Sequence, residues 1–209
     1  MPVPSGGYGP VSLTDRRYGI TDVGLARSFG YGLGPRDPAR AVRPARPEIG
    51  ADGENVLSGQ GRSVVNGIAV PEGGCIGEAD RNLTEPGTSS VDIRKGNQLN
   101  LESFAQSRQD SRVQAAFRSW SACMEQAGYH YADPLAAAAD PAFAGTPDPQ
   151  QIAVALVDID CKARTDLVGI WFTVESAYQR RAIDADAAAF AAAKEAIVAR
   201  DRAATAVSR

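Results

Sequence analysis

The sequence is poor in the residues from which metal and redox centres are built. Its 209 residues include three cysteines and a single histidine. Cys75, Cys123 and Cys161 lie 48 and 38 residues apart, spacings that fit no zinc motif, and no Cys-x-x-Cys pair of the thioredoxin type occurs. His130 is at metal-ligand spacing from none of them. We therefore expect no metal and no cofactor.

Clustered basic charge and long apolar runs are also missing. The formal net charge is −3, which argues against a nucleic-acid partner, because neutralising phosphates requires a basic surface. No apolar run approaches the roughly 18 residues of a membrane span, so no transmembrane segment is expected. Residues 1–7 lack the basic start and apolar stretch of a signal peptide. Either the protein stays inside the cell, or the chain starts after a removed export signal.

Glycine and proline are concentrated near the start of the chain. The first 70 residues contain about 20 of them, close to the roughly 25 to 30% at which a packed core becomes improbable. We expect residues 1–62 to form a mildly basic arm with little regular structure, apart from one short helical turn after Thr21 or Asp22. Apolar residues between Tyr18 and Leu33 could dock this arm onto the body of the protein or onto a partner.

Residues 63–209 carry the periodic pattern of a helical domain. Asn66-Gly67 between two short β-branched runs predicts a β-hairpin at 63–70, because Asn-Gly supplies the two positive φ angles of a type I′ turn. Asp-Pro pairs at 133, 140 and 148 mark helix starts. The expected fold class is all-α, a small antiparallel helical bundle with a long C-terminal helix. The expected helices span residues 75–85, 92–108, 111–127, 149–163 and 166–207.

Two of these helices have clear apolar stripes. Val113, Phe117, Trp120 and Met124 follow one another at steps of four, three and four, after a capping box at Ser111 and Gln114, and Gly128 ends the helix. A second stripe comprises Ile152, Leu156, Ile159 and Ala163. We expect the two helices to pack antiparallel through these stripes.

The cysteines offer a covalent link for this pair of helices. Cys123 and Cys161 lie one in each helix, and a disulfide would form if their Cα atoms came within about 6 Å. That bond would indicate an oxidising compartment and leave Cys75 free. A bond from Cys75 to either of the other cysteines is the competing pairing.

The last predicted helix is too long for a domain of this size. About 40 residues of helix extend roughly 60 Å. Ile183, Phe190 and Ile197 recur every seven residues along it, a pattern typical of helices that pair. We expect its Ala-rich end to project or to pair with another helix, and a homo-oligomer formed through this helix is one such arrangement.

The candidate binding surface lies around the start of this helix, where acidic, basic and aromatic residues are mixed. Glu175 follows Trp171 by four residues, so a carboxylate lies on a largely apolar face, where it could act as a general acid or base or pair with an arginine. No catalytic residue is assigned. The candidate surface consists of Arg164, Asp166, Trp171, Glu175, Tyr178 and Arg181.

Several short motifs resemble a family of actinobacterial proteins, chiefly from streptomycetes, that usually carry an export signal or a lipoprotein anchor. The matching stretches are residues 17–21, 71–79, 120–124, 128–131 and 161–171. The resemblance covers most of the chain and implies a location outside the membrane. It implies no activity and no catalytic residue, and the usual leader is not present in this chain.

Three hypotheses follow from the sequence. The first is a non-enzymatic extracytoplasmic helical protein that binds a protein or a cell-envelope component through the C-terminal helix or the apolar arm. The second is a small hydrolase or thiol-redox enzyme that uses Glu175, His130 or Cys75. The third is a cytoplasmic helical adaptor with reduced cysteines.

Overall fold

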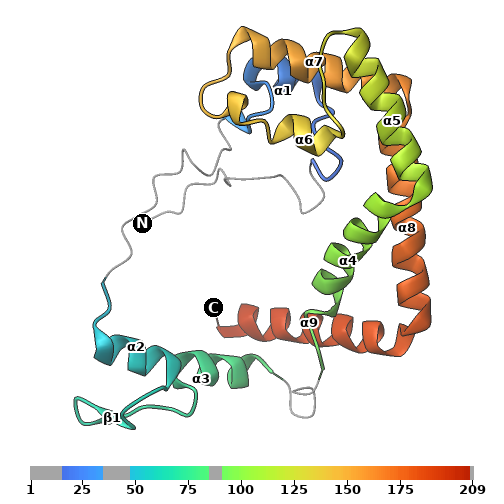
Figure 1. Ribbon diagram of the computed structural model, residues 1–209. Coiled ribbons are helices and arrows are strands. Elements are labelled where there is room, and N and C mark those ends of the chain that lie inside the picture. The colour runs from blue at the N-terminus through green and yellow to red at the C-terminus, as the bar shows by residue number, and fades with distance from the viewer. Residues whose placement is uncertain (1–15, 35–47, 85–90, 208–209) are drawn as a thin grey trace. The chain divides into compact units, whose positions relative to one another are not determined.

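The computed structural model describes residues 16–34, 48–84 and 91–207 (Figure 1). The described residues are helical with a single two-stranded hairpin, which confirms the expected all-α fold class. They divide into two compact units. Unit 1 contains residues 16–34 and 102–179, and unit 2 contains residues 48–84, 91–101 and 180–207. Both units are therefore built from separate stretches of the chain.

Unit 1 is formed mainly by helices whose starts are fixed by aspartate side chains. Asp22, Asp133, Asp140 and Asp148 each accept a hydrogen bond from a backbone N–H of the first turn that follows. Its elements are α1 (Val23–Phe29), the second half of α4 (Lys95–Gln109), α5 (Ser111–Gln126), α6 (Pro134–Ala138), the 3-10 turn η3 (Pro141–Phe143), α7 (Pro149–Arg164) and most of α8 (Leu167–Ala185).

Helix α5 starts and ends as a helix of this sequence should, with one correction. The cap is Asp110, whose carboxylate accepts from the Arg112 N–H, and not the Ser111 box; the Gln114 side chain donates instead to the Arg108 carbonyl. At the other end Gly128 has φ +86°, and the Tyr129 N–H bonds the Met124 carbonyl at 3.0 Å. This left-handed cap is the one predicted.

The core of unit 1 confirms one predicted stripe and corrects the other. Val113, Phe117, Trp120 and Met124 are all buried. On α7 the buried side is displaced by one or two residues, because it includes Asp158 and Lys162, whose charges offset each other and hide the face from a search for apolar periodicity. The buried residues of α7 are Gln151, Val154, Ala155, Asp158, Cys161 and Lys162.

Helices α5 and α7 meet at their C-terminal turns. Trp120 contacts Asp158, and Cys123 is bonded to Cys161, so each contact lies near the end of both helices. The expected antiparallel packing along their length is not found. The physical reason is the connection, in which α6 and η3 occupy much of residues 127–148 and carry the chain back before α7 begins.

The N-terminal arm contributes more to the core than expected. We call residues 16–34 the strap. In it Ile20, Ala26 and Tyr31 are buried in the core of unit 1, and α1 packs against α7. The expectation that residues 1–62 add little core is therefore wrong for the strap. The other arm residues fall partly outside the described ranges: 1–15 and 35–47 are not described.

Unit 2 contains a helix that composition did not reveal, α2 (Ala51–Ser58), followed by the hairpin of β1 (Val64–Val65) and β2 (Ile68–Ala69) and by α3 (Gly74–Leu83). Val65 pairs with Ile68, and Asn66 and Gly67 have φ values of +50° and +78°. The predicted hairpin is thus confirmed with its type I′ turn.

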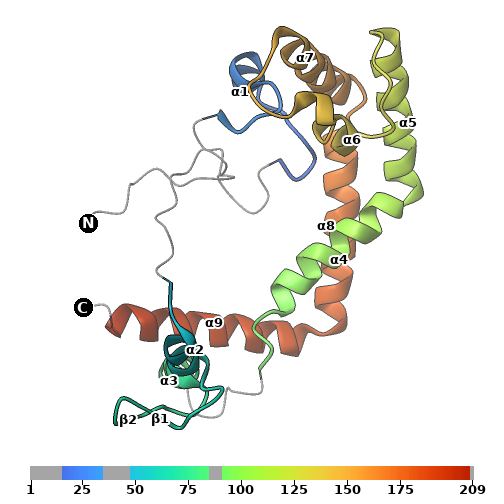
Figure 2. The same cartoon turned by 60° about the vertical axis from the view of Figure 1, so that its left-hand side comes forward.

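Close backbone approach joins α2 to α3. An added Cβ at Gly74 would lie 2.4 Å from the Leu57 carbonyl oxygen, and Gly74 itself has φ +64°. Only glycine fits this position. Helix α3 in turn contacts α9 (Ala187–Val207), where Arg200 bonds Asp80 at 2.8 Å and Thr84 at 2.6 Å (Figure 2).

The expected helix over 166–207 is broken. It ends as α8 at Ala185, and α9 begins at Ala187. Asp186 lies between them, where its carboxylate accepts from the Ala189 N–H and pairs with Lys95 at 2.5 Å. An aspartate that caps a new helix start and is held by a lysine explains the break. None of the helices in the described part of the chain is both long and apolar enough to cross a membrane.

Candidate functional site

The six residues expected to form a binding surface are not gathered on one. Trp171 is 0% exposed and Glu175 is 1% exposed, so both lie inside unit 1. Tyr178 is half-buried and donates to Asp110 at 3.2 Å. Arg164 and Asp166 are exposed, with Arg164 3.7 Å from Asp160. Arg181 is exposed and belongs to unit 2.

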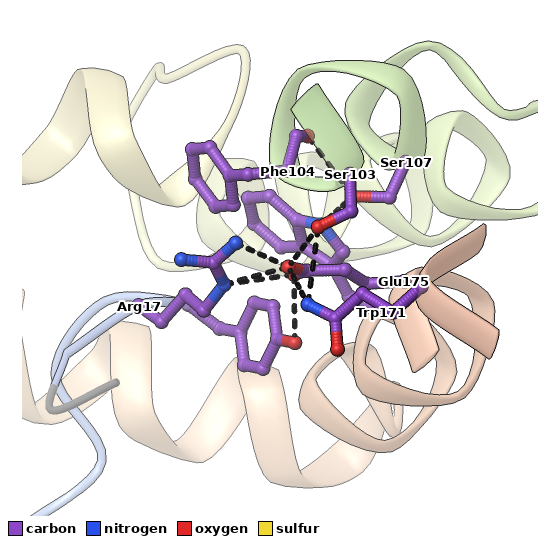
Figure 3. A network of polar contacts seen from close by, with 8 residues as sticks. Arg17, Ser103, Phe104, Ser107, Trp171 and Glu175 are labelled. Atoms are coloured by element: carbon purple, nitrogen blue, oxygen red, sulfur yellow. Dashed lines mark hydrogen bonds and ion pairs between the residues drawn. The ribbon is translucent and has the colours of Figure 1, made fainter. Parts of the chain in front are cut away.

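Glu175 is instead the centre of a buried polar network, shown in Figure 3. Arg17 of the strap approaches the carboxylate side-on, with Nε 2.8 Å from Oε1 and 2.9 Å from Oε2, and Nη2 also donates to Oε1. Tyr18 donates to Oε2 at 2.9 Å. From α4, Ser103 donates to Oε1 at 3.1 Å, and from α8 Gln179 donates to the same atom at 3.0 Å.

Aromatic side chains enclose this network. The Trp171 ring lies 5.0 Å from Tyr18, 5.2 Å from Phe104 and 4.9 Å from Phe117, measured between ring centroids. The guanidinium of Arg17 lies 4.7 Å from the Phe104 centroid, within cation–π range. Trp171 Nε1 donates to Ser107 at 2.9 Å. The strap is thus held to α4, α5 and α8 by stacked rings as well as by charge.

The geometry of Glu175 is that of a structural carboxylate. Both oxygens accept hydrogen bonds from protein donors, and the side chain is closed to solvent, so no substrate proton can reach it in this arrangement. Burial raises the pKa of Tyr18, and the hydrogen bond to Glu175 raises it further, so the phenol stays a donor. The sequence suggested that Glu175 would pair with an arginine of a neighbouring helix. An arginine does pair with it, but it comes from the strap.

A second buried cluster lies on α7. Lys162 Nζ is 2.8 Å from Asp158 Oδ2 and donates to the Ile20 carbonyl at 3.0 Å. Trp120 Nε1 donates to Asp158 Oδ1 at 2.9 Å. Burial raises the pKa of Asp158, while Lys162 and the Trp120 indole act in the opposite direction. The strap is therefore fixed at two points, by Glu175 and by Lys162.

The disulfide closes unit 1 beside this cluster. Cys123 and Cys161 are bonded with their Cα atoms 5.7 Å apart, as the predicted pairing requires, and Cys161 is 1% exposed. Cys75 is free and exposed in unit 2.

The three residues of the enzyme hypothesis are not brought together. Glu175 is buried in unit 1, Cys75 is exposed at the start of α3, and the His130 side chain is 79% exposed with Nδ1 3.9 Å from Glu125. Among the described residues, no group of three histidine, cysteine or acidic side chains is placed to hold a metal ion.

Sequence reasoning missed the residues that hold the strap. Arg17, Ser103 and Lys162 were not singled out, and the partners of Arg17 are up to 158 residues away. The Asp158–Lys162 pair had a readable signal, opposite charges four residues apart on a helix. No protein-family model, no curated protein and no solved structure matches the chain.

Proposed function

We propose that this is a non-enzymatic extracytoplasmic helical protein that binds a protein or another component of the cell envelope. The single observation that supports the compartment is the Cys123–Cys161 disulfide inside the core of unit 1. Disulfides of this kind persist in oxidising compartments and are rare where thiols are kept reduced. The proposal includes a relationship to the actinobacterial exported proteins and lipoproteins that the motifs around the three cysteines resemble.

The binding part of the proposal rests on how the charged and aromatic groups are used. Glu175, Asp158 and Lys162 have protein partners on every side that the structure describes, which favours a scaffold over a reaction centre. The apolar residues of the strap are docked on unit 1 and are occupied. The outward side of α9, in contrast, exposes Ile197 and Val198 at 48% and 40% and is the surface left for a partner.

The exposed thiol of Cys75 makes the compartment measurable. Cells that make the full-length protein with its own leader are treated with a membrane-impermeant maleimide, lysed, and then alkylated with a second reagent under denaturing, non-reducing conditions. We expect one impermeant label on Cys75, no label on Cys75→Ser, and no further thiols until a reductant is added. Three thiols that react only after lysis would favour the cytoplasmic adaptor and overturn the proposal.

Partner binding needs its own test. Purified protein is mixed with cell walls and with membrane vesicles from the producing cells and is then sedimented. We expect saturable co-sedimentation with one of these fractions, and competition by unlabelled protein. A protein that stays in the supernatant with both fractions would contradict envelope binding, whatever the result of the thiol labelling.

A further inference from the structure

Helix α9 has two opposite faces with different surroundings. Ala193 and Ala196 are 4% and 6% exposed, and Arg200, on the same side, bonds residues of α3. The opposite face is open and hollowed. It is lined by Ala191, Lys194, Glu195, Val198, Ala199 and Arg202. Lys194, Glu195 and Arg202 make no ion pair with any other described residue.

The order of side chains on this open face is complementary to itself under a two-fold rotation. A two-fold axis between Val198 and Ala199 places Glu195 opposite Arg202 of a second, antiparallel copy, because the two residues lie equally far from the axis. Val198 then faces Ala199 of the second copy at the centre. The same operation repeats both contacts, which gives an apolar centre with an ion pair on each side.

We propose that α9 pairs with α9 of a second copy of this chain in this antiparallel register. The outer positions suit close approach, since Ala191 and Ala203 are small and helix spacing is set by the side chains at the contact. Other antiparallel registers are less favourable. An axis on Val198, for example, would place Lys194 opposite Arg202 and Glu195 opposite Asp201.

A single pair of helices buries less than the roughly 1,200 Å² of standard interfaces, so the dimer belongs to the weak, concentration-dependent class. The inference concerns self-association of purified protein. It is independent of the compartment and of the envelope partner proposed above.

Charge reversal tests both the dimer and its register. Glu195 and Arg202 are seven residues apart, about 10 Å along the helix, so they cannot pair within one copy. Glu195→Arg and Arg202→Glu each turn two attractive contacts into repulsive ones, and each should weaken dimerisation about tenfold. The double variant E195R/R202E restores opposite charges and should return to within about threefold of the unaltered protein.

The measurement is sedimentation equilibrium of the full-length protein from low micromolar to millimolar concentration. Lys194→Glu is the matched control: residue 194 faces Ala203 in the proposed register, so dimerisation should be unchanged. All four positions are on the surface, and far-UV circular dichroism verifies that the helices remain. A protein that stays monomeric throughout, a double variant that does not recover, or a control as weak as E195R would each overturn the proposal.

Discussion

Unit 1 and unit 2 are stabilised by different kinds of contact. Unit 1 encloses both tryptophans, a disulfide and three buried charged side chains, and its segments are joined across as many as 158 residues. Among the described residues of unit 2, the buried hydrophobic side chains are Val65, Ala193 and Ala196. Its ion pairs each have at least one partner whose side chain is about half exposed or more.

The difference teaches which substitutions each unit will tolerate. A buried charge leaves its partner uncompensated when it is removed, which is costly, whereas an exposed pair contributes little. In unit 2 the close glycine contact between α2 and α3 takes the place of a large core. Because Trp120 and Trp171 both belong to unit 1, tryptophan fluorescence reports that unit alone, and the comparison can be tested one unit at a time.

The largest effect is expected from Arg17→Ala. It leaves Glu175 buried without its cation and should lower the free energy of unfolding of unit 1 by about 3 to 5 kcal/mol. Urea titration followed by tryptophan fluorescence measures it. Arg27→Ala, at an exposed position of the same strap, should stay within about 0.5 kcal/mol. Equal effects of the two variants would mean that the strap is not held by Glu175.

Removal of the disulfide comes next. Replacing Cys123 and Cys161 together by serine opens a loop of 38 residues and should cost about 2 to 4 kcal/mol in the same titration. Cys75→Ser should leave the urea midpoint where it was, since that residue is exposed and unbonded. The comparison between units would weaken if the double serine variant destabilised unit 2 instead.

Gly74→Ala should break unit 2 and leave unit 1 intact. A Cβ would lie 2.4 Å from the Leu57 carbonyl oxygen at a backbone conformation that favours glycine, for a cost of about 1 to 3 kcal/mol. Thermal melting by far-UV circular dichroism should show early loss of helix while tryptophan fluorescence keeps its midpoint. Gly96→Ala in α4, where nothing lies within 4 Å, is the control and should be neutral or slightly stabilising.

Acid should weaken unit 1 in part through Asp110. Hydrogen bonds from the Arg112 guanidinium and N–H hold the pKa of this carboxyl well below its usual range. Because the folded pKa is depressed, the contribution is complete above the unfolded pKa of about 3.9 and is lost as the pH falls through the folded value. Asp110→Asn can still cap α5. It should be less stable than the unaltered protein by about 1 kcal/mol at pH 7, with the gap closing towards pH 2. A gap that is constant with pH would exclude this source of acid sensitivity.

The smallest effect is expected from Arg62→Ala. Its pair with Asp52 in unit 2 has side chains that are 70% and 53% exposed, so the change should stay below about 0.5 kcal/mol. Circular dichroism of unit 2 is the measurement. A loss as large as that of Arg17→Ala would show that exposure is a poor guide to the strength of an ion pair here.

Local signals in the sequence were sufficient for most of the helices. Asp-Pro starts, the Gly128 cap, the Asn66-Gly67 turn and the Trp120 stripe depend on residues close together in the chain, and each is found as predicted. The cysteine pairing also followed from helix positions. These features are determined by backbone preference and periodicity, which a single sequence displays.

Contacts over long distances were not readable in the same way. The strap was averaged into a Gly/Pro-rich region, although Arg17, Ile20 and Tyr31 within it are held by the body of unit 1. The break at Asp186 depends on Lys95, some 90 residues earlier. Composition and periodicity describe one segment at a time, so neither indicates which distant residue will meet it.

The interleaving of the two units has a consequence for biosynthesis. Unit 1 needs the strap and residues up to Gln179, and unit 2 joins α3 to α9, whose last described residue is Val207. A ribosome releases residues in order, so the Arg17–Glu175 contact has to wait for α8, and the Arg200–Asp80 contact for α9. Neither unit can finish folding while the chain is still being made. A polypeptide that stays open for so long suits a translocation channel that accepts only unfolded chains.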